Sequence, residues 1–304
     1  MRHNFRYPTI IKNNNKYIIY IGIGDVTEGY TVFIKTKKFP NEIYKISDKK
    51  NTIVTRFLCA HNFTVFYTKD NKLYGLGGQI KNQGPWNIFK YKSGLYLFRY
   101  ENNEWIKDKN PIISVDNCPS DCIISMEEKA PQFDSNICCF YSNLLKKYLL
   151  FVRANIKKGC RSTQLTTSID LKKWNPFKLL NIDTFKIGNN NYMFKCIEIY
   201  KHKLFFALTP FTDKPINPNE HYIKKLISYD SINWKDFGIL KNEELCNDDI
   251  HLNVHVAEIF FEKDILEIVL LKNVYYKRAI LKSYKFKYDK SKKFEDFIKS
   301  IRIE

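Results

Sequence analysis

The feature that most constrains the fold of this 304-residue chain is a strand hairpin that recurs five times along it. In each copy an apolar strand is followed by a short polar turn, then a Lys or Asp that opens a second apolar strand. Short polar turns between such strands are typical of β-hairpins. The first strands are residues 8–11, 62–67, 137–141, 196–200 and 256–261. The second strands are residues 16–20, 72–76, 147–151, 203–207 and 264–268.

A second pattern follows the hairpins: a Ser, an Asp two residues later, and a Trp four residues after the Asp. It occurs at residues 168–174 and 228–234, and residues 99–105 keep the spacing with altered first members. Ser and Asp side chains can bond nearby backbone N–H groups, so the pattern predicts a turn. The Trp is expected to pack between neighbouring repeats.

Five repeats that start about 55 to 75 residues apart, each with about four strands, predict an all-β fold. We expect a five-bladed β-propeller with four-stranded antiparallel blades, forming a single domain over residues 1–304. The blades should start near residues 5, 60, 132, 192 and 254. The best helix candidate is residues 294–303, and the long polar stretch 114–131 is expected to form a loop over one face.

The formal net charge of +18 raises the question of a nucleic-acid partner. The lysines are scattered in small groups, which favours a solvated basic surface, and no nucleic-acid partner is predicted. No apolar stretch reaches the roughly 18 residues needed to span a bilayer, and the polar N-terminus has no signal-peptide core. We therefore expect a cytoplasmic protein without a membrane partner, free or carried in a virus-like particle, with its oligomeric state open.

The eight cysteines are expected to be free thiols in such a compartment. The one close pair, Cys118 and Cys122, has no further ligands at a spacing familiar from zinc sites. We predict neither a metal nor a cofactor.

Several short stretches resemble the five-bladed glycoside hydrolase superfamily, which holds families 32, 43 and 68 and uncharacterised relatives. They are residues 60–64 (Ala-His-Asn-Phe-Thr) with the Gly pair at 77–78, residues 133–136 (Phe-Asp-Ser-Asn), Arg161, and the turn at 168–174. The resemblance covers nearly the whole chain. It implies a central funnel lined by the first strand of each blade. It also implies three carboxylates, from the first, third and fourth blades, that act as base or nucleophile, transition-state stabiliser and general acid.

By this resemblance Asp134 stands where the third-blade stabiliser is expected, although a turn-capping role is also open. Glu198 is the only acid in the first strand of blade 4, so it is the candidate general acid. The first blade has Tyr7 before a proline where the family commonly has Asp, and that strand contains no acid. Because strand side chains alternate, Glu258 shares the parity of Asp134 and is an equal candidate for the pocket.

The predicted substrate-binding residues are polar or aromatic groups near the strand ends: His61, Asn62, Arg153, Arg161 and Trp86. His61 and Asn62 could bond sugar hydroxyls, the arginines could hold Asp134 or a substrate carboxylate, and Trp86 could stack on a sugar ring. A structural role in the fold is the alternative for each of them.

Two functions remain open on this basis. The first is a cofactor-free glycosidase that uses acid and base carboxylates on a carbohydrate in the funnel, which Asp134 and the His61-Asn62 pair favour. The second is a propeller that binds a glycan or a protein and has lost catalysis, which the missing acid of blade 1 favours.

Overall fold

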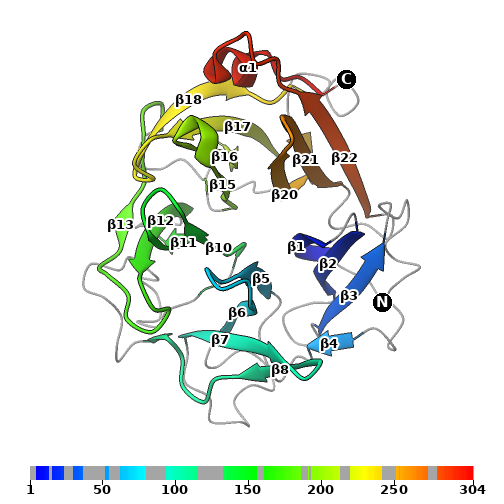
Figure 1. The fold of residues 1–304 in the computed structure, drawn as a ribbon, viewed down its shortest axis with the longest axis vertical. Coiled ribbons are helices and arrows are strands. Elements are labelled where there is room, and N and C mark those ends of the chain that lie inside the picture. Colours follow the sequence, from blue (N-terminus) through cyan, green and yellow to red (C-terminus); the bar gives the residue numbers. More distant parts are fainter. Residues whose placement is uncertain are drawn as a thin grey trace.

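A computed structural model describes residues 5–13, 16–23, 30–36, 52–54, 62–79, 94–114, 133, 135–155, 161–185, 191, 193–212, 220–241, 251–252, 254–272 and 279–303. Five sheets stand in a ring around a central axis, in the order of the sequence (Figure 1). The predicted all-β, five-bladed propeller is therefore confirmed.

Each blade starts with the strand nearest the axis and continues outward. Blade 1 consists of β1 (Phe5–Asn13), β2 (Lys16–Ile23), β3 (Tyr30–Thr36) and β4 (Thr52–Val54). Blade 2 consists of β5 (Thr64–Tyr67), β6 (Leu73–Gln79), β7 (Gly94–Glu101) and β8 (Glu104–Lys107). Blade 3 consists of β10 (Cys138–Ser142), β11 (Lys147–Asn155), β12 (Arg161–Ser168) and β13 (Lys178–Leu179). Blade 4 consists of β15 (Lys195–Ile199), β16 (Leu204–Phe211), β17 (Glu220–Ser228) and β18 (Asn233–Ile239). Blade 5 consists of β20 (His255–Glu262), β21 (Ile265–Lys272) and β22 (Ile280–Lys287).

The expected four antiparallel strands describe blades 1 and 3, and the other blades depart from that number. In blade 2, β9 (Ile113–Ser114) also pairs with β7. In blade 4, β14 (Asn181–Ile182) pairs in parallel with β18, and β19 (His251–Leu252) pairs with β17. Strands of two residues carry no readable periodicity, so the sequence did not reveal them.

Blade 5 has three described strands and continues into the helix α1 (Phe294–Ser300) rather than into a fourth strand. The predicted helix at 294–303 is thus confirmed, although it ends earlier. Its buried residues Phe294, Phe297 and Ile298 recur with the three- and four-residue spacing of a helix face, which is incompatible with a strand. Within the described residues, no helix is long and apolar enough to cross a membrane.

All five predicted hairpins form. The turns of blades 2 to 5 each place a residue in the left-handed region, with φ of 58° at Asn71, 54° at Lys146, 52° at Lys203 and 50° at Lys263. Left-handed residues give a tight turn the twist that antiparallel strands require. The second strand of each hairpin therefore lies directly outside the first.

The Ser–Asp–Trp turns of blades 3 and 4 also form as predicted. In blade 4, Ser228 Oγ and Asp230 Oδ1 accept backbone N–H groups of their own turn. The same contacts recur around Ser168 in blade 3. Trp234 is buried in the core between blades 3 and 4, edge-on to Phe151 and Phe194. The turn thus fixes an aromatic ring that joins two blades.

The third copy of this pattern differs. Asn102 and Asn103, with φ of 51° and 65°, form a two-residue hairpin between β7 and β8. Asn tolerates left-handed backbone better than most residues, so a tight turn replaces the Ser–Asp turn. Trp105 is nevertheless buried between blades 1 and 2, where it contacts Tyr20 and Phe63 edge-on.

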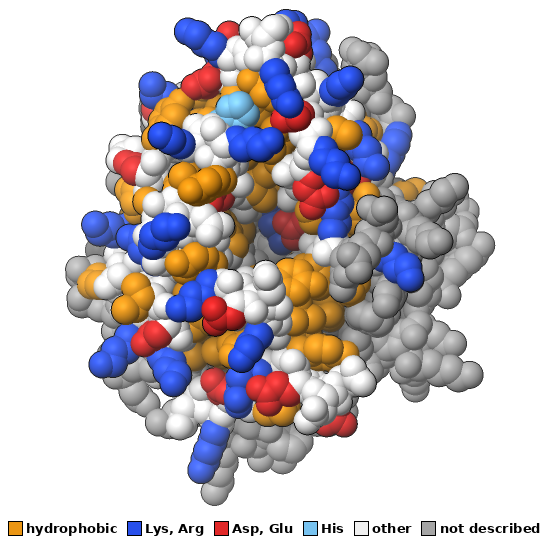
Figure 2. All heavy atoms as spheres, in the orientation of Figure 1, with side chains coloured by type: hydrophobic (Ala, Val, Ile, Leu, Met, Phe, Trp, Pro, Cys, Tyr) orange, Lys and Arg blue, Asp and Glu red, His pale blue; other side chains and the backbone are white. Residues whose placement is uncertain are grey.

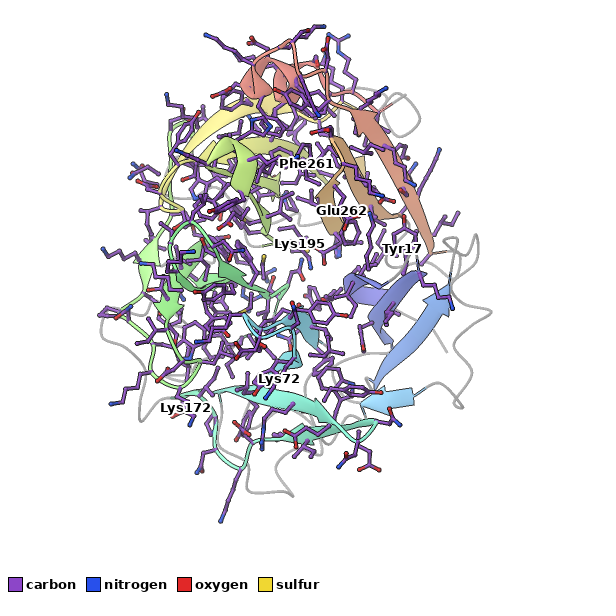
Figure 3. All side chains as sticks on the ribbon, in the orientation of Figure 1. Tyr17, Lys72, Lys172, Lys195, Phe261 and Glu262 are labelled. Atoms are coloured by element: carbon purple, nitrogen blue, oxygen red, sulfur yellow. The ribbon has the colours of Figure 1, made fainter. Side chains whose placement is uncertain are left out.

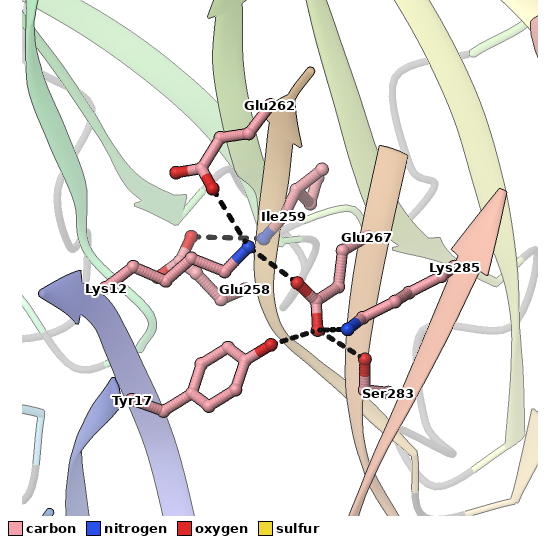
Figure 4. A network of polar contacts seen from close by, with 8 residues as sticks. All are labelled: Lys12, Tyr17, Glu258, Ile259, Glu262, Glu267, Ser283 and Lys285. Atoms are coloured by element: carbon pink, nitrogen blue, oxygen red, sulfur yellow. Dashed lines mark hydrogen bonds and ion pairs between the residues drawn. The ribbon is translucent and has the colours of Figure 1, made fainter. Parts of the chain in front are cut away.

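Blades 1 and 5, from the two ends of the chain, meet through a polar side-chain network (Figure 4). Glu267 of β21 is 2% exposed, and its carboxylate lies 2.6 Å from Lys12 Nζ. It accepts hydrogen bonds from Tyr17 Oη at 2.7 Å and Ser283 Oγ at 2.5 Å. Burial opposes ionisation of Glu267, but the bonds from Lys12, Ser283 and Tyr17 outweigh it and hold the pKa of Glu267 below its ordinary value. We call this network the ring clasp.

A second anchor holds the C-terminal segment to blade 4. Lys225 of β17 is buried, and its Nζ donates to the carbonyls of Lys299 at 3.0 Å and Ile301 at 3.2 Å. Carbonyls in the last turn of a helix lack partners within the helix, so Lys225 satisfies groups that α1 leaves open. Burial lowers the pKa of Lys225 to about 8.

Replacing Glu267 with Gln should lower the free energy of unfolding by about 3 kcal/mol, because it leaves Lys12 without its buried partner. Urea unfolding at neutral pH, followed by tryptophan fluorescence, measures the loss. Glu262→Gln is the matched control, since Glu262 is 61% exposed and lies 3.4 Å from the same lysine. An exposed pair contributes less than about 1 kcal/mol. Equal losses in the two variants would contradict the role given to Glu267.

The ring clasp should also be sensitive to acid. The pKa of Glu267 is lower in the folded protein than in the unfolded chain, where it is about 4.3. Its stabilising contribution is therefore complete above that pH and is lost as the pH falls through the folded pKa. The difference in stability between wild type and Glu267→Gln should shrink below about pH 4. A difference that stays constant across an acid titration of unfolding would contradict this assignment.

Candidate functional site

A cavity of about 460 Å³ lies on the axis of the ring. Its walls come from the five inner strands, β1, β5, β10, β15 and β20, so every blade contributes to it. Figure 2 shows a hollow at the centre of the molecular face, with charged side chains at its bottom and hydrophobic ones near its rim. We call it the axial cavity.

The axis has two distinct ends. Because every blade repeats the same hairpin order, the inner strands begin together at one end, the head end, and reach their hairpin turns at the other, the turn end. Thr9 and Glu258 lie midway along β1 and β20, whereas Asn143 and Tyr200 lie beside the turns, and all four line the cavity. The axial cavity therefore extends from the middle of the axis to the turn end.

A buried ion pair lies in the middle of the axis. Lys195 is 2% exposed, and its Nζ is 3.3 Å from Glu258 Oε2. Glu258 also lies 3.4 Å from the backbone nitrogen of Ile10, which donates to the same oxygen. Blades 1, 4 and 5 thus meet at one carboxylate, and Figure 3 shows Lys195 beside the axis.

A β-bulge lies directly before Glu258 in β20. The pairing of β20 with β21 shifts register between Val256 and Glu258, so Ala257 is an extra residue in β20. A single extra residue reverses the alternation of side chains along the strand. From Glu258 to the turn the alternation is regular, because Glu258, Phe260 and Glu262 all line the cavity. Glu258 Oε1 accepts the N–H of Ile259 at 3.3 Å.

Three buried cysteines, Cys138, Cys139 and Cys196, also border the cavity, and all three are free thiols. Burial raises the pKa of Cys138 to about 11, although the ammonium of Lys195 acts in the opposite direction. Burial also raises the pKa values of Cys139 and Cys196 well above the ordinary value. Protonated thiols are poor nucleophiles and poor metal ligands. In the part of the chain that the structure describes, no three His, Cys, Asp or Glu side chains form a metal-binding group.

Aromatic side chains from four blades line the turn-end mouth of the cavity. They are Tyr67 of blade 2, Tyr141 of blade 3, Tyr200 of blade 4 and Phe260 of blade 5. Tyr67 and Tyr200 are 36% and 59% exposed, so their rings are open to a ligand. The sequence interpretation missed both this rim and Lys195. A usable signal was present, because each inner strand of blades 2 to 5 has one of these aromatic residues within two positions of its end.

The structure places Glu198 at the turn end, where its carboxylate holds the hairpin turn of blade 3. The backbone N–H groups of Asn143 and Leu144 donate to it at 3.1 Å each, and Ser142 Oγ bonds to the same carboxylate. These contacts use Glu198 to fasten blade 4 to blade 3. Glu198 also lines the axial cavity, and the general-acid role that the resemblance implies for it stays a prediction.

At the head end, Asn62 is 1% exposed and bonds backbone groups on both sides. Its Nδ2 donates to the carbonyl of Phe133, and its Oδ1 accepts the N–H of Gly78 at 3.2 Å. A Cβ on Gly78 would lie 2.7 Å from the Phe133 carbonyl, so only glycine permits this approach. Asn62 therefore fixes the segment that leads into blade 3, and its predicted contact with sugar stays a prediction.

The structure brings Arg153 and Arg161 to the head end of blade 3, on the paired strands β11 and β12. Arg153 is 7% exposed, and its backbone carbonyl accepts a hydrogen bond from Gln164 Nε2 at 3.2 Å. Arg161 is half-buried, and its carbonyl accepts the N–H of Asn191 at 2.9 Å. The other predicted site residues, Asp134, His61 and Trp86, lie outside the described residues.

Tyr7 occupies the position in blade 1 where the resemblance expects an acid. Its φ of 47° is in the left-handed region, in a register shift between Arg6 and Thr9. Its ring stacks on that of His255 from blade 5, with centroids 6.3 Å apart and planes at 16°. A bulky residue in this backbone region is strained, and such strain is common at functional sites. An aromatic pair thus replaces the expected carboxylate.

The described acids at the cavity already have partners within the protein. Glycoside hydrolysis needs two carboxyl groups about 5–5.5 Å apart for retention or about 6.5–9.5 Å apart for inversion. Glu258 reaches the middle of the axis and is paired with an ammonium, while Glu198 holds a turn. The described part of blade 1's inner strand contains no acid. What remains is a cavity with a charged floor and an aromatic mouth.

Comparison with known proteins gives a likeness in fold alone. No family model and no curated protein sequence matches the chain. A thermostable family-43 glycoside hydrolase aligns with a TM-score of 0.58 over 95% of this chain and 92% of its own, at 9% identity. Sucrose-6-phosphate hydrolase from Lactobacillus gasseri gives 0.59 over 95% of this chain and 62% of its own, at 10% identity. An N-acetylgalactosamine deacetylase from F. plautii, in complex with blood group B trisaccharide, gives 0.53 over 93% of this chain and 89% of its own, at 10% identity. The chain shares the five-bladed fold of glycoside hydrolases.

Glu198→Gln tests whether this residue holds the turn or takes part in chemistry. Gln keeps one acceptor oxygen but points an NH₂ group at backbone N–H donors. We therefore expect the free energy of unfolding to fall by about 1–3 kcal/mol, measured by urea unfolding. Unchanged stability would contradict the turn-holding role.

Proposed function

We propose that the protein binds a carbohydrate in its axial cavity, and that binding rather than hydrolysis is its principal activity. The observation that carries this proposal is the state of the one described carboxylate in the middle of the axis. Glu258 is paired with Lys195 at 3.3 Å, so the pair offers hydrogen-bond donors and an acceptor in place of an acid and a base.

The surroundings of the pair suit a sugar. A cavity of about 460 Å³ is within the range of small-ligand pockets, roughly 300–1,000 Å³. Aromatic rings can stack on the apolar face of a sugar, and polar groups can bond its hydroxyls. The mouth supplies the rings of Tyr67, Tyr141, Tyr200 and Phe260, and the floor supplies Lys195 and Glu258.

The comparisons support the same class of ligand. The similar deacetylase is in complex with a trisaccharide, and another similar structure is a sucrose-6-phosphate hydrolase. Both descriptions concern carbohydrates in those proteins. Since one fold hosts many functions, the likeness supports the ligand class, and the choice between binding and hydrolysis depends on the residues of this chain.

Hydrolysis of the bound carbohydrate is the second candidate. It is favoured by the sequence at the head of blade 3, where Asp134 stands between the buried residues Phe133 and Ser135. In this alternative Asp134 would stabilise the transition state, and Glu258 would serve as the second carboxylate after release from Lys195. Arg153 and Arg161 come from the same end of blade 3 and would orient the substrate.

Binding should be measured first on an array of defined oligosaccharides, and then by calorimetry with the oligosaccharide that binds best. Tyr200→Ala should raise the Kd about tenfold, because it removes a stacking surface at the mouth. Tyr229→Ala is the control, since Tyr229 is similarly exposed on the same blade and does not line the cavity. Wild-type protein that binds no oligosaccharide on the array, or equal losses in the two variants, would overturn the axial site.

Turnover separates the two candidates. We expect the bound oligosaccharide to stay intact on prolonged incubation with wild-type protein, with no new reducing ends detected by chromatography. Release of shorter sugars by wild type, lost in Asp134→Asn and in Glu258→Gln, would establish hydrolysis and displace the binding proposal. Circular dichroism of each variant shows that the loss does not come from unfolding.

A further inference from the structure

The outer edge of blade 5 is open in the described structure. Blades 1 to 4 each have a fourth strand outside the third, whereas no described strand pairs with the outer edge of β22. The chain continues from β22 into the segment that contains α1, and Ile303 pairs with Lys241 beside blade 4 instead. The backbone of β22 is therefore available along one side among the described residues.

A groove of about 690 Å³ follows this edge. Five consecutive residues of β22, numbers 283–287, line it, together with Phe297 and residues 300–303 of the C-terminal segment. Consecutive strand residues point to opposite faces of a sheet, so a groove that touches all of them runs along the strand edge rather than over one face. The groove is thus placed where a fourth strand would lie.

The charged residues that line the groove are mostly positive. Its lining includes the cations Lys285, Lys287, Lys292 and Arg302, and one anion, Asp289. Asp289 already accepts hydrogen bonds from the backbone N–H and the hydroxyl of Ser291. An occupant with negative charge would therefore find several partners and little repulsion.

Along β22, lysine side chains alternate with aromatic ones. Lys285 and Lys287 are exposed on one face, while Tyr284 and Phe286 are partly buried on the other and pack against the core of blades 4 and 5. In antiparallel strands, directly opposite residues interact, and opposite charges or apolar pairs are favourable. A matching strand would alternate acidic residues with apolar ones.

From these observations we infer that the edge of β22 is a docking site for an extended acidic peptide segment of a partner protein, which adds to blade 5 as its fourth strand. Backbone hydrogen bonds along the edge would supply affinity, as in other cases of strand addition. Glu or Asp side chains opposite Lys285 and Lys287, alternating with Val or Ile opposite the aromatic residues, would supply specificity. Lysines can also serve to keep an exposed edge from pairing, which is the competing account of this surface.

The test uses a short fluorescent peptide of alternating Glu and Val, with fluorescence anisotropy as the readout on the full-length protein. We expect saturable binding that weakens about tenfold or more in Lys287→Glu, because an attraction becomes a repulsion. Lys235→Glu is the matched control: Lys235 is exposed on β18, the fourth strand of blade 4, and does not line the groove. A peptide of alternating Lys and Val should not bind.

A version of the acidic peptide with N-methyl groups on alternate backbone nitrogens separates strand addition from simple charge attraction. It keeps every side chain but loses the donors that pair with a strand edge, so its binding should be abolished. Equal binding of the N-methylated peptide, equal weakening by Lys287→Glu and Lys235→Glu, or no binding of the acidic peptide would each overturn the inference.

Discussion

The structure depends on how the first blade is joined to the last. Among the described strands, none is shared between blade 1 and blade 5, so backbone hydrogen bonding does not close the ring there. The ring clasp around Glu267 takes over that task, with Lys12 and Tyr17 on one side and Ser283 on the other. The same joint brings the backbone of Ile10 to Glu258 on the axis. The geometry of the axial cavity is therefore tied to the closure of the ring.

The sequence was sufficient for the elements that local pattern determines. Hairpins and Ser–Asp–Trp turns are short, and their own residues indicate both the alternation of the strand side chains and the position of the turn. The site could be predicted only in part, because it joins residues far apart in the chain. Lys195 and Glu258 are 63 positions apart, so no local pattern indicates that they pair. The contact of Glu198 with a turn 54 to 56 positions earlier has no local signal either.

The presence of the ion pair on the axis is explained better by a role in function than by a contribution to stability. Removing two charges from water is costly, and well-packed apolar residues are often at least as stable as a buried ion pair. A propeller that needed only a filled axis could place aliphatic side chains there, as the cores between its blades do. Retaining Lys195 and Glu258 beside a cavity with an aromatic mouth is consistent with a ligand that needs both stacking and hydrogen bonds. The same pairing engages the carboxylate of Glu258 with the ammonium of Lys195.

Blade 5 differs from the other blades in two ways, and one strand links them. After β22 the chain forms α1, no described strand pairs with the outer edge of β22, and Lys225 holds the C-terminal segment to blade 4. Ser283 of this strand bonds Glu267 in the ring clasp, while residues 283–287 also line the groove. A segment added to the edge would therefore order the strand that supports the clasp. The open edge and the closure of the ring are in this way parts of one structural unit, since both depend on the position of β22.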